Sequence, residues 1–311
     1  MPVEVLQLTP LVAAGDEELH RNYSVCRWDE LPDKERWLDE NDAGIRAVVT
    51  GGHLGISNDM LRRLPSLGIV AIAGVGYERV DLDVARGRGV RVTNTPDALT
   101  DDVADFSIGL MIATMRQIAA GDRFVRDGSW LSGPMPLASK VSGRNYGIVG
   151  LGRIGQAVAR RLEGFGGTIA YTARAPKEVP YAFHATALDL ARACDTLIVT
   201  IAGGLATRNL IGRQVLDALG PAGFLVNVAR GSIVDEAELA AALQEGRLGG
   251  AGLDVYADEP NVPPALAALP TVTLTPHIGS ATTHARAAMA RQMLANLDAF
   301  YAGRPLPNAV V

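Results

Sequence analysis

The chain has 311 residues, which is enough for two domains that each bury a core of their own. Its composition is that of a folded globular protein, with 48% hydrophobic, 20% charged and 5% aromatic residues. The formal net charge of -5 provides no basic surface for nucleic acid or anionic lipid, so a small molecule is the expected partner.

Cysteine content and the N-terminal sequence bear on the cellular compartment. Cys26 and Cys194 lie far apart and lack any spacing typical of a metal site, so we expect buried thiols and no bound metal. No basic segment precedes an apolar run at the N-terminus, and no apolar run reaches membrane-spanning length. These features favour a cytoplasmic protein without a membrane partner.

Residues 1–99 alternate short apolar runs with helix-like segments. Strands are expected near 47–50, 69–72 and 90–92, with a helix over 58–64, which is the rhythm of βαβ units. From Thr100 a long apolar segment with helical spacing runs to Ile118, behind an acidic start that suits a helix N-terminus. We expect this helix to connect two domains.

Residues 120–140 lack clear periodicity and contain three glycines and two prolines beside Trp130, which predicts an extended excursion or surface loop. Strand and helix patterns then alternate again, with strands expected over 145–149, 168–172, 196–201, 224–228, 251–255 and 272–275. A last amphipathic helix over 283–301 is expected to return to the first domain. The predicted fold is therefore α/β, with one doubly wound domain from 1–99 plus 283–311 and another from 100–282.

A glycine-rich turn follows the predicted strand 145–149. Gly150, Gly152 and Gly155 form the pattern G-x-G-x-x-G directly before a helix, which is typical of a dinucleotide-binding turn. In such a turn the N–H groups from Leu151 to Ile154 face the pyrophosphate, and Arg153 either caps a phosphate or points to solvent. A glycine-rich turn without a ligand is the alternative, but the strand and helix on either side favour dinucleotide binding.

The next predicted strand ends at Thr172, where an enzyme that uses NAD would place an acidic residue on the ribose. No acid occurs there. Arg174 follows instead, with Lys177 three residues later, and a guanidinium at this place suits the 2′-phosphate of NADP. We therefore expect NADPH/NADP to be preferred and NADH/NAD to remain possible, although a loop arginine can also simply be solvated.

Three polar residues, Arg230, Glu259 and His277, lie at or shortly after the ends of predicted strands. Carboxyl ends of strands are where doubly wound sheets bind ligands. Singly, each residue could be structural; together they supply a guanidinium, a carboxylate and an imidazole. Reduction of a 2-keto acid needs a carboxylate anchor, a polarised carbonyl and a proton donor, and a carboxylate beside the histidine would favour the imidazolium acid.

From about Gly74 to the C-terminus the sequence resembles the D-isomer-specific 2-hydroxyacid dehydrogenases, and more closely their glyoxylate/hydroxypyruvate and hydroxyphenylpyruvate reductase branch. The likeness is carried by ordered motifs at residues 74–77, 99–105, 150–155, 227–231, 250–255, 258–260 and 276–280. The resemblance implies a Rossmann dinucleotide-binding domain and a flavodoxin-like substrate domain that the C-terminal helix completes. It also implies a homodimer whose loop around Trp130 reaches the partner's site.

The resemblance also assigns roles to residues. Arg230 binds the substrate carboxylate and carbonyl, His277 donates the proton, and Glu259 pairs with His277. The N–H groups of Val75 and Gly76 hold the substrate carboxylate. Asp254 orients the nicotinamide carboxamide, and further cofactor contacts fall on Ile201, Val228, Ala229, Arg230, His277 and Gly279.

The expected activity is NADPH-dependent reduction of glyoxylate or hydroxypyruvate, and three alternatives remain open. Leu54, Tyr77 and Trp130 could line a larger pocket for hydroxyphenylpyruvate. A corepressor-like nucleotide sensor could keep the same residues, although the chain lacks long polar tails. An NAD-linked biosynthetic dehydrogenase is disfavoured because no acid follows Thr172.

Two further details qualify the resemblance. Glu259 stands where the formate dehydrogenase branch would have glutamine, which argues against that branch. Residues 202–204 read Ala-Gly-Gly where relatives usually carry a proline, so this cofactor-side loop departs from the family pattern. The remaining histidines, His20, His53, His184 and His284, are expected to be structural or exposed, although His53 could line a cleft.

Overall fold

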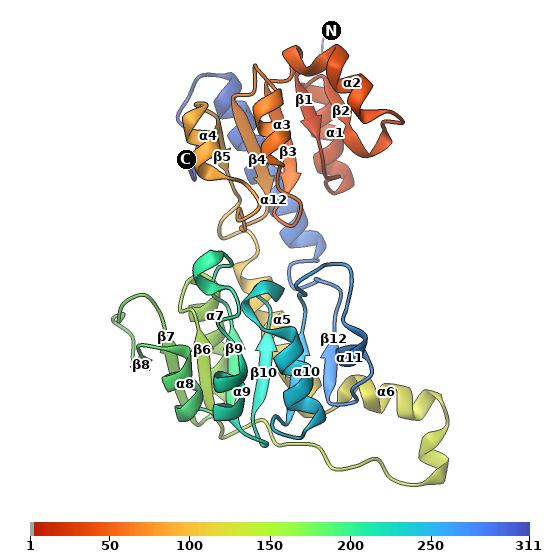
Figure 1. Ribbon diagram of the computed structural model, residues 1–311, viewed down its shortest axis with the longest axis vertical. Helices are drawn as coiled ribbons and strands as arrows, with labels where there is room; N and C mark the ends of the chain where they lie inside the picture. The colour runs from red at the N-terminus through yellow and green to blue at the C-terminus, as the bar shows by residue number, and fades with distance from the viewer. Residues whose placement is uncertain (1–2) are drawn as a thin grey trace. The chain divides into compact units, whose positions relative to one another are not determined.

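The computed structural model describes residues 3–311, which fall into two compact units (Figure 1). Unit 1 comprises Met1–Leu99 together with Ala281–Val311, and unit 2 comprises Thr100–Ser280. Within residues 3–311, no single helix is both long enough and apolar enough to cross a membrane, and only the bent pair Thr100–Met115 and Ile118–Arg126 meets that test together.

Unit 1 is built on a five-stranded parallel sheet with the order β2-β1-β3-β4-β5. The strands are β1 (Val5–Gln7), β2 (Val25–Arg27), β3 (Ala47–Gly51), β4 (Ile69–Ala73) and β5 (Arg91–Thr93). The helices are α1 (Ala13–Asn22), α2 (Lys34–Asn41), α3 (Asn58–Arg63), α4 (Leu82–Gly87) and α12 (Thr283–Tyr301). The βαβ pattern expected for this region is confirmed, and the short strands β1 and β2 are additional.

Helix α12 belongs to unit 1, although it is the last helix of the chain. Its buried residues Met293, Leu294 and Leu297 join one core cluster with Val49 of β3 and Ala71 of β4. The expectation that the final helix packs on the first domain is confirmed. Because parallel strands need cover on both faces, α12 completes, together with Leu19 of α1, the layer on one face of this sheet.

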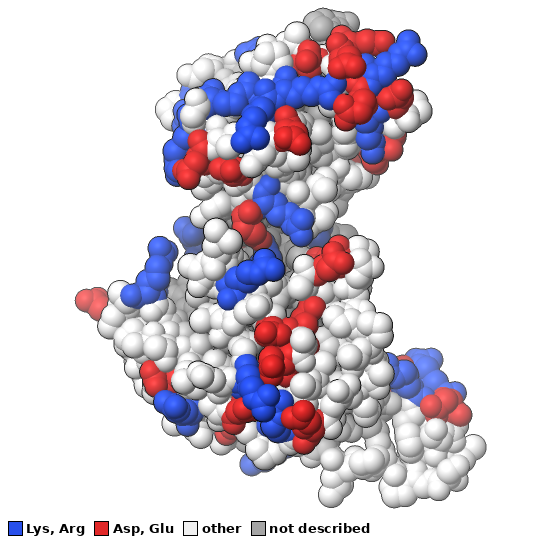
Figure 2. Space-filling model, in the orientation of Figure 1, with Lys and Arg blue, Asp and Glu red and all other residues white. Residues whose placement is uncertain are grey.

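Basic side chains of unit 1 are accompanied by acidic ones. Figure 2 shows a band of Lys and Arg over unit 1 with Asp and Glu beside it. Arg63 contacts both Glu35 and Asp39, and Arg86 lies 2.9 Å from Asp83. These pairings offset the positive charge locally, in keeping with the negative net charge of the sequence.

Unit 2 contains a seven-stranded parallel sheet with the order β12-β11-β10-β9-β6-β7-β8. Its strands are β6 (Asn145–Val149), β7 (Thr168–Thr172), β8 (Ala182–His184), β9 (Thr196–Val199), β10 (Phe224–Asn227), β11 (Gly250–Leu253) and β12 (Val272–Leu274). Its helices are α5 (Thr100–Met115), α6 (Ile118–Arg126), α7 (Arg153–Leu162), α8 (Ala187–Ala193), α9 (Arg213–Leu219), α10 (Glu236–Gln244) and α11 (Pro264–Ala267). The strand order reverses between β6 and β9, and ligands bind at such a switch point in doubly wound sheets.

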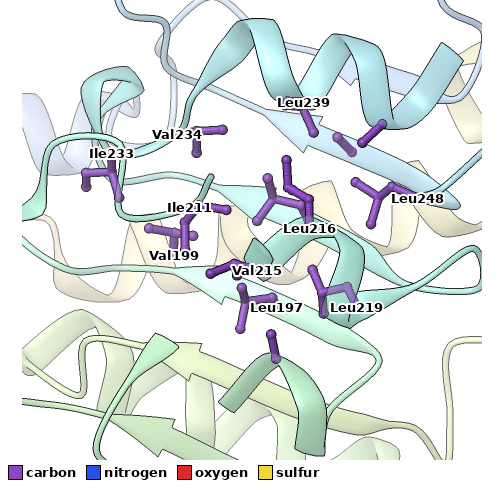
Figure 3. Packing of buried hydrophobic residues seen from close by; sticks show 14 of the residues in the cluster. Leu197, Val199, Ile211, Val215, Leu216, Leu219, Ile233, Val234, Leu239 and Leu248 are labelled. Atoms are coloured by element: carbon purple, nitrogen blue, oxygen red, sulfur yellow. The ribbon is translucent and has the colours of Figure 1, made fainter. Parts of the chain in front are cut away.

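The core of unit 2 explains why its central strands read as continuous apolar runs. Every residue of β9 and β10 is buried, because helices cover both faces of the sheet. In Figure 3, Leu197 and Val199 of β9 lie beneath Leu216 of α9 and Leu239 of α10. On α5, Leu110 lies where a side chain at Gly252 of β11 would have to go.

The segment after α5 differs from the sequence prediction. The long helix ends at Met115 rather than Ile118, and Gln117 takes a left-handed conformation with φ of 54°. Helix α6 then spans Ile118–Arg126, where an irregular loop was expected, and a short 3-10 turn covers Ser129–Ser132. The prediction was wrong for α6 because Gly121 and the glycines and prolines after it were read as loop signals, although Ile118 and Val125 lie on one apolar face of the helix.

Candidate active site

Two glycines of the turn after β6 are required for steric reasons, whether or not the turn binds a ligand. Gly150 has φ of 98°, and a Cβ there would lie 2.6 Å from Cα of Ile201. A Cβ at Gly155 would overlap the carbonyl of Gly150 and would also meet the hydroxyl of Thr200. Thr200 donates a hydrogen bond of 2.7 Å to that carbonyl. Larger residues would push α7 away from β6.

The N-terminus of α7 is open at this turn. Gly152 is the N-cap residue, no side chain caps the helix, and a Cβ built at Gly152 meets no heavy atom within 4 Å. The N–H groups of Ile154 and Gly155 in the first turn of the helix therefore remain for an anion, and the helix dipole favours one. The predicted residues Gly150 to Gly155 fit the pyrophosphate of a dinucleotide.

The end of β7 places the predicted ribose-side residues next to this turn. The N–H of Gly150 donates to the carbonyl of Thr172 at 2.9 Å. Arg174 and Lys177 are exposed on the loop that follows, and the N–H of Lys177 donates to the Tyr171 hydroxyl at 2.7 Å. Neither cation has an ion pair with a described residue within 4 Å, so the loop presents two positive charges.

The remaining predicted cofactor residues follow the strands on the other side of the switch point. Ile201 comes after β9, and Val228 and Ala229 come after β10, where the N–H of Ala229 donates to the side chain of Asn227 at 3.1 Å. The loop Ala202–Gly204, which departs from the family pattern, is closed by the Thr207 hydroxyl at 3.0 Å from the Ala202 carbonyl. No proline is needed to make that turn.

His277 and Glu259 form a hydrogen-bonded pair. Nδ1 of His277 lies 2.7 Å from Oε2 of Glu259, and the N–H of Tyr256 donates to Oε1 at 3.1 Å. The two side chains retain 34% and 25% exposure, so a substrate can reach them while water is partly excluded. Because Nδ1 is engaged, Nε2 is the ring nitrogen that can serve a substrate.

The Glu259 carboxylate is held in its charged form. Burial by itself raises its pKa, but hydrogen bonds from His277 and from the N–H of Tyr256 act in the opposite direction. The positive charges of His277 and Arg230 add to them, so the pKa of Glu259 lies below its usual value. Arg230 is therefore close enough to act electrostatically on the pair.

A close backbone approach brings the Arg230 loop to the Glu259 loop. Gly231 lies so near the backbone of Tyr256 that a Cβ would overlap it. The side chain of Asn227 donates to the Arg230 carbonyl at 3.0 Å, and the Arg230 guanidinium donates to the Ala229 carbonyl at 2.6 Å. The structure thus brings together the three residues that the sequence singles out.

Asp254 organises the loop that carries His277. Its carboxylate is 1% exposed and accepts from the N–H groups of Ile278 and Gly279 at 2.9 and 2.8 Å, and from the Thr275 hydroxyl at 2.7 Å. The N–H of His277 donates to the Asp254 carbonyl at 2.9 Å. Burial raises the pKa of Asp254 although these hydrogen bonds oppose the rise. The contacts of Asp254 show that it positions His277, whose φ is 54°. Its predicted role in orienting the nicotinamide carboxamide stays a prediction.

Two supporting residues were not found from the sequence. Glu236, in the first turn of α10, accepts a hydrogen bond of 2.8 Å from the N–H of Ala257 and thereby braces the loop that holds Glu259. Tyr256 donates through its hydroxyl to the carbonyl of Thr275 at 3.0 Å. Glu236 follows the N-cap Asp235, so in the sequence it resembles an ordinary acid at a helix start.

The predicted substrate contacts Val75 and Gly76 belong to unit 1, on the loop after β4. The side chain of Asn94 donates to the Val75 carbonyl at 2.8 Å. Gly52 must lack a side chain here because a Cβ would lie 2.7 Å from the Gly76 carbonyl. These contacts hold the carbonyl groups of Val75 and Gly76 in place. Binding of the substrate carboxylate by the N–H groups of the same two residues stays a prediction.

The comparisons with known proteins agree with this geometry. A family model described as the NAD-binding domain of D-isomer-specific 2-hydroxyacid dehydrogenases matches residues 108–279, which is more than half of the chain. The chain belongs to this family. It is therefore an oxidoreductase with the two α/β domains typical of the family.

Similar proteins within the family cover nearly the whole chain. Glyoxylate/hydroxypyruvate reductase A of Arabidopsis thaliana and hydroxyphenylpyruvate reductase of Plectranthus scutellarioides are each 44% identical over 310 residues, with 99% of both chains covered. The structure of the NADPH-dependent glyoxylate/hydroxypyruvate reductase of Sinorhizobium meliloti, in complex with NADP and malonate, matches with a TM-score of 0.91 and 39% identity. That match covers 100% of this chain and 97% of the other.

Proposed function

We propose that this protein reduces small 2-keto acids, with glyoxylate and hydroxypyruvate as the leading substrates, to D-2-hydroxy acids with NADPH. The observation that carries the proposal is the 2.7 Å contact between His277 and Glu259 with the charge of Arg230 beside it. A cation, a proton donor and its carboxylate partner are the groups that this reduction needs. Reductases that act on these substrates are among its relatives.

Each residue has a defined part in the proposed reaction. The reduced nicotinamide, when bound, supplies the hydride that adds to C2. The electron pair of the carbonyl then moves to its oxygen, where the Arg230 guanidinium stabilises the charge and His277 Nε2 delivers a proton. Glu259 holds the imidazole in place through Nδ1. The N–H groups of Val75 and Gly76 bind the substrate carboxylate in this scheme.

NADPH as the preferred cofactor is supported by the loop after Thr172. It holds Arg174 and Lys177 where an acid would bind the ribose of NAD. Charge-assisted hydrogen bonds from a guanidinium suit a 2′-phosphate. The Sinorhizobium meliloti relative is described as NADPH-dependent, which supports the same choice here.

Substitution of the proton donor tests the proposal. Asn at 277 tolerates the left-handed backbone, so His277→Asn removes the imidazole with little strain. NADPH oxidation with glyoxylate should fall about 10²- to 10⁴-fold, the usual contribution of a general acid. The matched control His284→Asn, at an exposed position, should leave the rate unchanged. Failure of the native protein to oxidise NADPH with any 2-keto acid would favour the corepressor-like alternative.

Hydroxyphenylpyruvate is the second candidate substrate. Leu54 and Tyr77 are 47% and 41% exposed in unit 1, and exposed apolar side chains of this size suit an aromatic ring. The Plectranthus scutellarioides relative is named for that substrate. A comparison of kcat/KM for glyoxylate, hydroxypyruvate and hydroxyphenylpyruvate decides between the candidates.

We further propose a cytoplasmic homodimer. Cys26 and Cys194 are free thiols, which suits a reducing compartment. The segment from α6 to Leu137 extends away from the sheet of unit 2 (Figure 1) and exposes Leu131 and Leu137 by 95% and 98%. Large exposed apolar side chains on one segment are typical of a protein interface, and a second copy of the chain is the proposed partner.

A further inference from the structure

Helix α10 begins on the segment of chain that carries Arg230. Arg230 follows β10, and the short 3-10 turn Gly231–Ile233 comes directly after it. Asp235 is then the N-cap of α10, and Glu236 is the first residue of the helix. Arg230 and Glu236 therefore stand at the two ends of one short segment of unit 2.

This segment has a fixed position in unit 2. The N–H of Ile211 donates to the Ile233 carbonyl at 3.0 Å, and the N–H of Asp235 donates to the Ile211 carbonyl at 3.0 Å. The side chain of Asp235 accepts from the N–H of Glu238 at 3.1 Å and so caps α10. Ile211 and Ile233 are buried in the same core cluster (Figure 3). Glu236 therefore extends from a well-anchored helix start.

Two carboxylates hold consecutive N–H groups in the loop that precedes Glu259. The N–H of Tyr256 donates to Oε1 of Glu259 at 3.1 Å, and the N–H of Ala257 donates to Oε1 of Glu236 at 2.8 Å. The first contact lies within the loop, whereas the second joins the loop to α10. Because the two N–H groups lie on either side of the Tyr256 Cα, the contact with Glu236 also restrains the N–H that Glu259 accepts.

The same two segments meet at a second point. A Cβ at Gly231 would overlap the carbonyl of Tyr256 and the nitrogen of Ala257, so the two backbones are in direct contact there. Packing at Gly231 and the hydrogen bond at Glu236 thus act on the same short stretch of the loop. Two separate contacts fix an orientation that one contact would leave free to rotate.

The surroundings of Glu236 do not favour a carboxylate. Burial raises the pKa of Glu236, the hydrogen bond from the N–H of Ala257 opposes the rise, and the negative charges of Asp258 and Glu259 add to it. An acid that served only the dipole of α10 would need none of these neighbours. The contact with Ala257 is what distinguishes Glu236 from an ordinary acid at a helix start.

We propose that Glu236 is a positioning residue for the reduction: by holding the N–H of Ala257, it keeps the Glu259 carboxylate aligned with Nδ1 of His277. Glu236 acts through Glu259 and not on the substrate. The inference rests on the proposed function, since the alignment matters for turnover only if His277 delivers a proton. A displacement of about 1 Å in such a group is enough to slow a reaction on the order of a hundredfold.

Glu236→Ala tests the proposal, with Glu236→Gln as the conservative variant. With glyoxylate and NADPH, kcat should fall about ten- to a hundredfold in the alanine variant, the range that corresponds to one hydrogen bond to a charged group, while KM for NADPH changes little. The glutamine variant keeps an oxygen that accepts from the N–H of Ala257, so it should recover most of the lost kcat. A native kcat in the alanine variant, or an equal loss in both variants, would overturn the proposal.

Glu238 provides the matched control. It is another acid in the first turn of α10, and its carboxylate lies 4.0 Å from the guanidinium of Arg213 on α9. Glu238→Ala removes the same charge from the same turn, so it reproduces any effect on the helix dipole and should leave kcat unchanged. A loss of kcat as large as that in Glu236→Ala would assign the effect to α10 as a whole and overturn the proposal.

Amide hydrogen exchange in the full-length protein, measured by NMR, gives a readout without turnover. In Glu236→Ala the N–H of Ala257 loses its acceptor, so its exchange should accelerate about tenfold or more relative to Glu238→Ala. Equal exchange rates in the two variants would overturn the proposal. If the native protein reduces no 2-keto acid and the exchange still accelerates, Glu236 holds the loop as inferred and the proposed function fails. Native turnover with an unchanged kcat in Glu236→Ala means the reverse.

Discussion

The contact between Glu259 and His277 makes the pH dependence of the reaction a test of one residue. The pKa of Glu259 is lowered, so its charge persists across the neutral range and is lost only as the pH falls through that lowered value. The carboxylate lies 2.7 Å from Nδ1 of His277 and orients the ring so that Nε2 serves the substrate. Glu259→Gln should therefore lower the rate of NADPH oxidation, and the variant should lack the loss of rate that the native enzyme shows as the pH falls through the pKa of Glu259. An acid limb that persists unchanged in the variant would remove Glu259 from this role.

Arg174 allows a second test at the scale of a single side chain. Arg174→Ala should raise KM for NADPH by about ten- to a hundredfold and change KM for NADH far less, because only NADPH carries the 2′-phosphate. Arg160→Ala, an exposed arginine in the last turn of α7, removes the same charge from unit 2 and should leave both constants unchanged. A parallel loss of both cofactors in Arg174→Ala would make Arg174 a solvated loop residue.

Sequence reasoning found the residues that carry chemical groups and missed those that hold them. Arg230 and His277 were recognised because they follow strand ends, where doubly wound sheets bind ligands, and because they stand in motifs that resemble those of the family. Glu236 and Tyr256 contact loops some twenty residues distant in the chain, and no local pattern records such contacts. The buried contacts that Asp254 makes with the His277 loop likewise depend on how β11 and β12 pair.

At the scale of elements, the glycine after Arg230 links two loops of the site. A Cβ at Gly231 would overlap the backbone of Tyr256, so Gly231→Ala must move either the Arg230 loop or the loop that orients Glu259. Overpacking of this kind costs about 1–3 kcal/mol, which corresponds to a fall in melting temperature of about 2–10 °C, and kcat should fall with it. Gly109→Ala in α5 is the control, since a Cβ there meets nothing within 4 Å. Equal kcat in both variants would contradict this coupling.

The success of the strand and helix predictions differed with the burial of each element. The strands β6 and β7 and the helix α12 have the predicted bounds, because each buries a face with a regular period. Helix α6 was missed because its glycine and the glycines and prolines after it indicated a loop, and β8 was missed because it is a short, half-exposed edge strand. Prediction therefore failed where turn residues masked a helix and where a strand was too short to show a period.

The same observation leads to the scale of the whole molecule. None of the residues of α6 is buried in the single chain, and two of them are large apolar side chains. Ile118 is 55% exposed and Val125 is 56% exposed. A helix with an uncovered apolar face is marginal in water unless another surface covers it. We expect that cover to come from a second copy, which would explain why the helix forms although its own chain provides no core for it.

Paired charges on this segment test the assembly. The double variant Leu131→Glu with Leu137→Glu should be monomeric by sedimentation velocity at concentrations where the native protein sediments as a dimer, because burying two carboxylates in an apolar interface is costly. Its melting temperature should also lose the dependence on protein concentration that a dimer shows. Leu205→Glu is the matched control, since Leu205 is 94% exposed on a different loop of unit 2. If the native protein sediments as a monomer, or if the double variant remains dimeric, another surface or another partner must cover the apolar face of α6.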